Sequence, residues 1–321
     1  MHTSPTTNLG RRSLLQATGV LGLAAAGGLA LSQPAEATMA ATSRFNLASP
    51  YSRLFITKPL HENRTQQALA FDQANRRLFM LQGRRGSDGD DLCLNQVSFT
   101  GTPVGTMYLD NVGHGVGFGI ESVGTSSYVW TEALPDSTNR ATALKRFKWI
   151  PGTRPANVQY FFKGSKDISC AMDPIYKRLV VRLIPPGGTG HTNKVYSLPF
   201  GYPSQMKQIG EFYLPRAVSS LGPLQGFVPY GKNFYIFTGR AHRYQSDIDS
   251  TLATVDMNTS KQVGNASVTM AGCALPYREP EGLGIYRTQA GKTGLFFGFS
   301  SRDSYEGLNV YANIYVKNQM V

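Results

Sequence analysis

Residues 67–72 (QALAFD) are followed, after a short polar turn, by the apolar run LFML at residues 78–81. The same order recurs at residues 225–230 (QGFVPY) and 281–286 (EGLGIY), each with a second apolar run behind it. Each copy is a strand of small residues that ends in Asp or Tyr, a polar turn, and a second strand. Recurrence of such a unit is the signature of a repeat architecture.

Two further copies fit between these three. One starts at residues 114–121, and the other is residues 168–173 (ISCAMD). Each copy continues into a polar loop, a third strand and usually a fourth. Four strands repeated every roughly 45–55 residues are the sequence form of a propeller blade. Gly and Ala are frequent in the first strands, which suits the crowded centre of a propeller.

The sequence therefore predicts an all-β, five-bladed β-propeller over residues 60–321. Residues 38–59 would form an N-terminal extension or the strand that closes the ring. A β-sandwich of similar length is the alternative fold.

Residues 1–37 have the three parts of a secretory signal peptide. Arg11 and Arg12 precede a short apolar stretch at residues 20–32, and an A-x-A cleavage pattern follows at residues 35–37. The apolar stretch is shorter than the ~20 residues that span a bilayer, and an Arg pair followed by Leu is the twin-arginine variant. We expect export in the folded state by the twin-arginine pathway to an extracellular or cell-wall location. An uncleaved membrane anchor is the alternative.

The composition restricts the partners and the chemistry. The formal net charge is +12, with only 16% charged residues, which favours anionic partners such as wall polymers or acidic polysaccharides. Three cysteines do not make a disulfide scaffold, and Cys170 lies in an apolar strand pattern that suits a small core residue. The chain has no CxxC, HExxH or P-loop motif. We expect no cofactor, no nucleic-acid partner, no membrane anchor in the mature form, and a monomer.

The first strands of the blades predict one group of site residues. In a propeller, the starts of these innermost strands converge on one face. A purely structural propeller could have apolar residues there, but each repeat has a polar side chain. The candidates are Gln67, His114, Asp167, Gln225, Glu279 and Glu281. A water-filled polar channel is the alternative interpretation.

The loops between second and third strands predict a second group on the same face. Four of the five loops carry at least one Arg, whose planar fork of donors suits phosphate or carboxylate oxygens. The candidate ligand-binding residues in these loops are Arg85, Arg140, Arg240, His242, Tyr244 and Arg302. The acidic run at residues 88–91 could bind Ca²⁺, but it lacks the EF-hand spacing and is interpreted as a polar turn.

With these strands assigned, the chain resembles the family named teichoic acid biosynthesis protein C, whose propeller also forms the receptor-binding domain of some staphylococcal phage tail proteins. The motifs that carry the resemblance are residues 67–72, 113–115 with 119–121, 224–230 and 278–283. They are structural repeat motifs rather than a catalytic signature. The resemblance implies a five-bladed propeller that contacts wall glycopolymers.

Three functions remain open at this stage. The first is a module that binds an anionic, teichoic-acid-like glycopolymer at the channel mouth. The second is an enzyme that cleaves such a polymer as a glycoside hydrolase, lyase or phosphodiesterase, with His114, Asp167 and Glu281 as catalytic candidates. The third is a protein-interaction scaffold, for which the channel residues would be incidental.

Overall fold

The computed structural model describes residues 38–86 and 90–321. The predicted signal peptide at residues 1–37 lies outside this range. Across the described residues, no helix combines the length and apolar character needed to cross a lipid bilayer.

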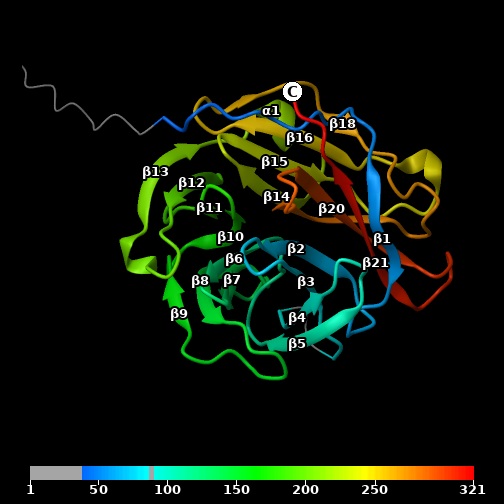
Figure 1. Ribbon diagram of the computed structural model, residues 1–321, viewed down its shortest axis with the longest axis horizontal. Helices are drawn as coiled ribbons and strands as arrows, with labels where there is room; N and C mark the ends of the chain where they lie inside the picture. The colour runs from blue at the N-terminus through cyan, green and yellow to red at the C-terminus, as the bar shows by residue number, and fades with distance from the viewer. Residues whose placement is uncertain (1–37, 87–89) are drawn as a thin grey trace, which may run out of the picture. The chain divides into compact units, whose positions relative to one another are not determined.

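Five antiparallel sheets built from the described residues stand around a central axis (Figure 1). Blade I consists of β2 (Gln66–Asp72), β3 (Arg77–Gly83), β4 (Leu92–Val97) and β5 (Pro103–Leu109). Blade II consists of β6 (Phe118–Val123), β7 (Ser126–Pro135), β8 (Ala141–Lys148) and β9 (Gln159–Phe161). Blade III consists of β10 (Lys166–Asp173), β11 (Arg178–Ile184), β12 (Thr192–Ser197) and β13 (Lys207–Phe212).

The last two blades depart slightly from this pattern. Blade IV has β14 (Leu224–Tyr230), β15 (Asn233–Thr238) and β16 (Thr251–Asp256), with the short β17 (Lys261–Gln262) and β18 (Ser267–Val268) both paired to β16. Blade V consists of β19 (Glu279–Arg287), β20 (Thr293–Arg302), β21 (Val310–Lys317) and β1 (Ser52–Lys58). Short helical turns lie in the connections: η1 (Pro203–Gln205), α1 (Arg216–Ser219) and η2 (Gln245–Asp247). The predicted all-β five-bladed propeller is confirmed, and the sandwich alternative is excluded.

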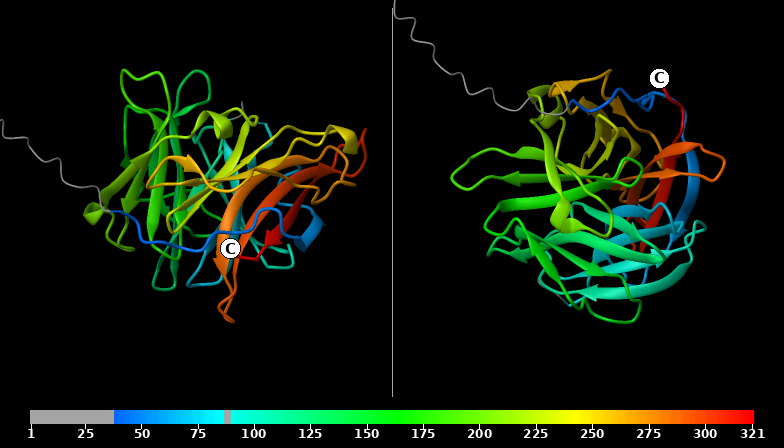
Figure 2. Two further views of the ribbon diagram at one scale, coloured as in Figure 1. Left: turned by 90° about the horizontal axis from the view of Figure 1, so that it is seen from above. Right: turned by 60° about the vertical axis from the view of Figure 1, so that its left-hand side comes forward.

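The N-terminal strand joins the last blade. In blade V, β1 pairs antiparallel with β21, so the outermost strand comes from the start of the described chain (Figure 2). Just before it, Phe45 forms a β-bridge with Met320, and its backbone N–H donates to the Tyr235 hydroxyl of blade IV (2.9 Å). Both ends of the described chain are therefore fastened to the same side of the ring.

Apolar side chains pack between neighbouring blades. Each hydrophobic cluster in the described residues draws side chains from two adjacent blades, and together the clusters cover all five interfaces. Phe237 of blade IV, for example, packs on Phe297 and Phe299 of blade V. Burial of apolar surface at about 25 cal/mol per Å² is the main force that holds such blades together. The predicted core role of Cys170 fits this arrangement, since it is fully buried between blades II and III, and all three cysteines are unpaired.

The inner strands approach one another too closely for larger side chains. A Cβ atom on Gly226 of β14 would lie 2.7 Å from Gly282 of β19, and one on Gly282 would lie 2.6 Å from Ala68 of β2. Gly282 also has a φ of +76°. Blades IV, V and I can therefore meet at the axis only because these positions carry little or no side chain.

Candidate functional site

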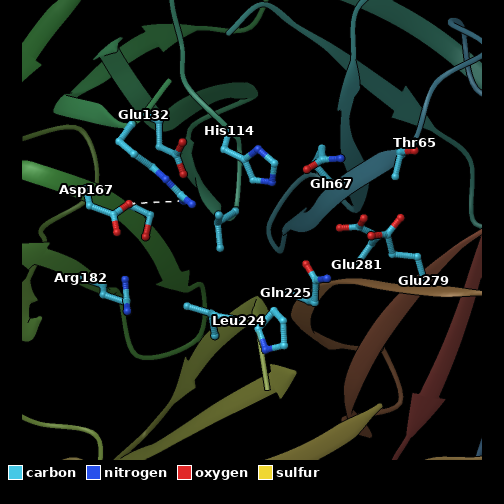
Figure 3. Close-up of a pocket in the computed structure, with 14 residues that line it drawn as sticks. Thr65, Gln67, His114, Glu132, Asp167, Arg182, Leu224, Gln225, Glu279 and Glu281 are labelled. Carbon is cyan, nitrogen blue, oxygen red and sulfur yellow. Dashed lines mark ion pairs between the residues drawn. The ribbon is translucent and has the colours of Figure 1, made fainter. Parts of the chain in front are cut away.

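A polar pocket opens at the end of the ring where the inner strands start (Figure 3). Its volume is about 450 Å³, within the usual range for ligand pockets. All five blades contribute to its wall. The lining residues are Thr65, Gln67, His114, Val116, Glu132, Arg140, Asp167, Ser169, Arg182, Pro223, Leu224, Gln225, Glu279 and Glu281.

Irregularities in the inner strands coincide with the pocket residues. The register with the second strand shifts at Gln67 in β2, at Asp167 in β10, at Gln225 in β14 and at Glu281 in β19. A bulge adds a residue that has no partner across the ladder and so can turn its side chain out of the regular alternation. In each of these four blades, the polar residue at the register shift lines the pocket.

Blade II supplies its pocket residues differently. The loop at residues 113–117 carries His114, while Glu132 comes from the middle of β7. One Glu132 oxygen accepts a hydrogen bond from the Gly115 backbone N–H (2.8 Å), and the other is buried without a hydrogen-bond partner. Burial raises the pKa of Glu132 to about 7, so this carboxyl is largely protonated at mildly acidic pH. Burial also lowers the pKa of His114, which favours the neutral imidazole.

Glu279 and Glu281 form the acidic wall of the pocket. Glu281 is only 4% exposed, and its carboxyl has no hydrogen bond or ion pair among the described residues. Burial, together with the Glu279 charge, raises the pKa of Glu281 well above its ordinary value. Burial also raises the pKa of Glu279, against the opposing effect of the Arg302 charge. Neutral Glu281 can both donate and accept hydrogen bonds.

The opposite wall carries the positive charge. Asp167 hydrogen-bonds the His191 ring (2.8 Å) and lies 3.5 Å from the Arg140 guanidinium, shown as the dashed line in Figure 3. The His191 hydrogen bond is the main cause that lowers the Asp167 pKa, so this carboxylate is ionised. Arg182 has no ion-pair partner within the described chain, and its Nε is buried without a hydrogen bond. Burial lowers the pKa of Arg182 to about 10, which still leaves it charged at neutral pH.

The structure brings the predicted first-strand residues together. Every residue of that group lines the pocket: Gln67, His114, Asp167, Gln225, Glu279 and Glu281. Of the predicted loop residues, Arg140 alone does so. The other five predicted loop residues do not line the pocket in the described structure.

The other loop residues lie outside the pocket for identifiable reasons. His242 is buried and its ring contacts Asp249 (2.8 Å), which fixes the β15–β16 loop, and Arg240 lies 3.6 Å from the same carboxylate. Tyr244 packs against Tyr305, and Arg85 is exposed. Arg302 stacks on a tyrosine ring just beyond Glu279. Long loops can fold onto their own blade, so equal position in the repeat does not ensure equal distance from the axis.

Glu132 and Arg182 are pocket residues that the sequence analysis did not identify. Both lie in second strands, β7 and β11, whereas the predicted site residues lie in first strands and loops. The usable signal was a charged residue inside an otherwise apolar strand, since burial of an unpaired charge is costly. In LVVR the charge directly follows buried apolar residues, and in YVWTE only the buried Thr131 separates it from them.

No cluster of three or more His, Cys, Asp or Glu side chains suited to a metal ion occurs in the described residues. The acidic turn considered for Ca²⁺ is only partly described, because Asp88 lies outside the range. Asp91, the last residue of this acidic run, lies 3.4 Å from the Arg84 guanidinium.

Comparisons with known proteins agree with this fold. A family model described as a phage five-bladed beta-propeller receptor-binding platform domain matches residues 65–155, from β2 to the β8–β9 loop. The description supports the predicted resemblance to phage tail propellers and makes no reference to teichoic acid biosynthesis. No curated protein matches the chain significantly.

Among solved structures, the tail fibre of Staphylococcus aureus phage P68 is similar with a TM-score of 0.66 at 14% identity, covering 84% of this chain and 53% of the fibre chain. The present chain thus spans about half the length of that fibre. An α-L-arabinofuranosidase from Lactobacillus brevis has a TM-score of 0.49 at 8% identity, covering 80% of this chain and 92% of the enzyme. Residues 65–155 thus match a phage receptor-binding propeller family, and the described chain has the five-bladed fold that this family's name denotes.

Proposed function

We propose that the chain binds a cell-surface glycan in the central pocket and that the glycan carries an anionic group, as a teichoic-acid-like wall polymer does. The observation that carries the proposal is the convergence of polar side chains from all five blades on one cavity of about 450 Å³. A structural channel has no need to leave so much hydrogen-bonding capacity unused in a buried place.

Sugar hydroxyls fit the acidic half of the pocket, because each hydroxyl donates one hydrogen bond and accepts others. Gln67 makes no hydrogen bond within the described chain, and Gln225 uses only its Nε2, which donates to Gly239 O (3.0 Å). The raised pKa of Glu281 favours its protonated form, which offers both a donor and an acceptor. These groups, from blades I, IV and V, would line one side of a bound sugar.

The anionic group fits the opposite half. Arg182 is a partly buried cation that makes no close ion pair in the described structure, although the Asp167 and Arg140 charges both act on it, and half of the Arg140 side chain is exposed. A desolvated cation gains most from an anion with matching oxygen geometry. The net charge of +12 would also attract a polyanion from a distance.

The matched family's description as a receptor-binding platform supports the same proposal. We further propose that the chain acts outside the cytoplasm after twin-arginine export. That part rests on the sequence of residues 1–37.

The test measures binding of purified wall teichoic acid to the wild-type chain and to Arg182→Gln by calorimetry at low and high salt. We expect Arg182→Gln to weaken binding at least about tenfold, and salt to weaken wild-type binding strongly because exposed charges are screened. Arg76→Gln is the matched control, since it removes the same charge from the exposed β2–β3 turn at the other end of blade I. Wild-type affinity that is unchanged by salt and by Arg182→Gln would contradict the proposal.

Cleavage of the glycan is a second candidate, favoured by the separation of carboxyl pKa values in one pocket. The pKa of Asp167 is lowered, whereas those of Glu132 and Glu281 are raised. An ionised carboxyl and a carboxyl with a raised pKa in one pocket are the arrangement that acid–base catalysis uses. The test is release of reducing ends, unsaturated products or phosphate from the same polymer. Turnover that disappears in Glu281→Gln and His114→Ala would establish an enzyme, and lack of turnover in the wild-type chain would exclude this candidate for that polymer.

A further inference from the structure

Three tyrosines gather on the loops of blades IV and V, outside the pocket lining. The rings of Tyr244 and Tyr305 lie 6.0 Å apart between centroids, and those of Tyr277 and Tyr305 lie 6.4 Å apart. We call these three residues the tyrosine rim. Tyr244 is 55% exposed and Tyr305 is 39% exposed, which is unusual for aromatic side chains that contact one another. Figure 2 shows their loops, η2 in yellow and β20–β21 in red, at the same edge of the ring.

The tyrosine rim is continuous with the pocket. The Arg302 guanidinium stacks over the Tyr277 ring at 4.5 Å, and its charge acts on Glu279 of the acidic wall. Tyr277 also lies two residues before Glu279 at the entrance of β19. A path therefore leads from Glu279 over Arg302 to Tyr277, then to Tyr305 and Tyr244.

The loops that carry the rim are held in place. The buried Arg278 donates hydrogen bonds to Ser250 Oγ (2.7 Å) and to backbone oxygens of the 269–271 segment, while His242 N donates to Arg278 O (3.0 Å). Arg243 reaches across to Glu306 (2.5 Å) and so ties the two tyrosine loops together. The rim is thus a preformed surface, which lowers the entropy cost of binding.

Tyr277 has a backbone conformation that calls for an explanation. Its φ is +50°, in the left-handed region that a bulky residue rarely adopts. Strain of this kind persists only where the surrounding structure enforces it, and it is concentrated at functional sites. Here it sets the Tyr277 ring beneath Arg302 and next to Tyr305.

We propose that the tyrosine rim binds further sugar rings of a glycan chain whose other part occupies the central pocket. This inference rests on the proposed function and extends it, because it makes the ligand a polymer of several units rather than a single residue. Exposed tyrosine rings offer flat apolar faces to the C–H faces of sugars, and their hydroxyls remain free for polar contacts. Arg302, which stacks over the Tyr277 ring, suits an anionic group between the sugars.

The experiment compares short and long fragments of glycosylated wall teichoic acid, separated by size, for binding to the full chain by calorimetry. The double variant Tyr244→Ala/Tyr305→Ala should bind long fragments at least about fivefold more weakly, since each aromatic contact contributes ~0.5–1.5 kcal/mol, and single repeat units as wild type does. Arg182→Gln should weaken both. Tyr202→Ala, which removes a 61% exposed tyrosine from blade III, is the control and should change neither.

The outcomes separate this inference from the proposed function. Loss of long-fragment affinity alone supports the rim. Wild-type affinity in the double variant overturns the rim and leaves the pocket proposal standing, whereas no binding of any fragment by the wild-type chain overturns both. Sedimentation of the same proteins decides a further case. If the wild-type chain self-associates and the double variant does not, the tyrosines form a protein interface and the glycan assignment is overturned.

Discussion

Two groups of buried carboxyls lie at opposite ends of the blades. Asp72 and Asp173 end the inner strands β2 and β10, whereas Glu132 and Glu281 face the pocket at the other end of the ring. All four are at most 4% exposed. By charge and burial alone they would be hard to tell apart.

Their hydrogen bonds distinguish them. Asp72 accepts from the Ser122 and Ser127 hydroxyls of blade II (2.5 Å each) and from Asn75, and so joins two blades. Asp173 accepts three backbone N–H groups, including that of Gly231 in blade IV (2.7 Å).

By contrast, Glu132 accepts one hydrogen bond while its other oxygen is buried without a partner, and the Glu281 carboxyl accepts none within the described chain. The hydrogen bonds of Asp72 and Asp173 join adjacent blades, and those of Asp173 oppose the burial that raises its pKa to about 6. The unsatisfied group is a cost to the fold that a ligand could offset.

The largest expected effect is at the satisfied end. Asp72→Ala should lower the free energy of unfolding by about 3–5 kcal/mol, because it leaves the Ser122 and Ser127 hydroxyls and the Asn75 backbone N–H without their acceptor. Urea unfolding followed by tryptophan fluorescence measures this, since Trp130 is fully buried. Glu281→Gln is the matched variant and should not lower stability. If Glu281→Gln destabilises the chain as much as Asp72→Ala does, the contrast between the two groups is wrong.

The repeats in the sequence were enough to predict the ring and the residues at the inner strand starts. Small residues, strand lengths and turns recur in every blade, so a strand that is ambiguous in one copy can be assigned from its position in the others. The polar residue at the start of each first strand could be identified for the same reason. The bulges that turn Gln67, Gln225 and Glu281 into the pocket left no separate signal, but they lie at those repeated positions.

Features that do not repeat could not be predicted in this way. Arg140 reaches the pocket while Arg240 contacts Asp249, although both occupy equivalent loops. Loop conformation depends on contacts peculiar to one blade, such as that between His242 and Asp249. Glu132 and Arg182 could not be predicted from the repeats, because each occurs in one blade only.

A second, smaller effect concerns pH at the unsatisfied end. Burial raises the folded-state pKa of Glu132 to about 7, from an ordinary value of 4.5. Below pH 4.5 the carboxyl is protonated in both states and costs nothing. As the pH rises from 4.5 to 7 the unfolded state ionises while the folded state keeps its proton, so the free energy of unfolding falls, by about 3 kcal/mol for this group.

Glu132→Gln should remove that loss. Unfolding free energies of wild type and variant should be close at pH 4.5, and the variant should be the more stable at pH 7.5. Glu306→Gln controls for the removal of one carboxylate, because Glu306 is exposed and contacts only Arg243 among the described residues. An equal difference between wild type and Glu132→Gln at both pH values would show that Glu132 is not held protonated by burial.

The smallest effect is expected at two adjacent glutamines: Gln66, which bonds to the fold through Nε2 although its buried Oε1 has no partner, and Gln67, which faces the pocket. Gln66 is buried and its Nε2 donates to Glu281 O (3.0 Å), whereas Gln67 lies at the bulge and faces the pocket. Gln66→Ala should lower the free energy of unfolding by about 1–2 kcal/mol and leave teichoic acid affinity near that of wild type. Gln67→Ala should do the reverse, with unfolding within about 0.5 kcal/mol of wild type and affinity reduced about threefold, as expected for one neutral hydrogen bond. Because the two side chains differ by one position in the same strand, a swap of these phenotypes would mean that the bulge does not decide which glutamine meets the ligand.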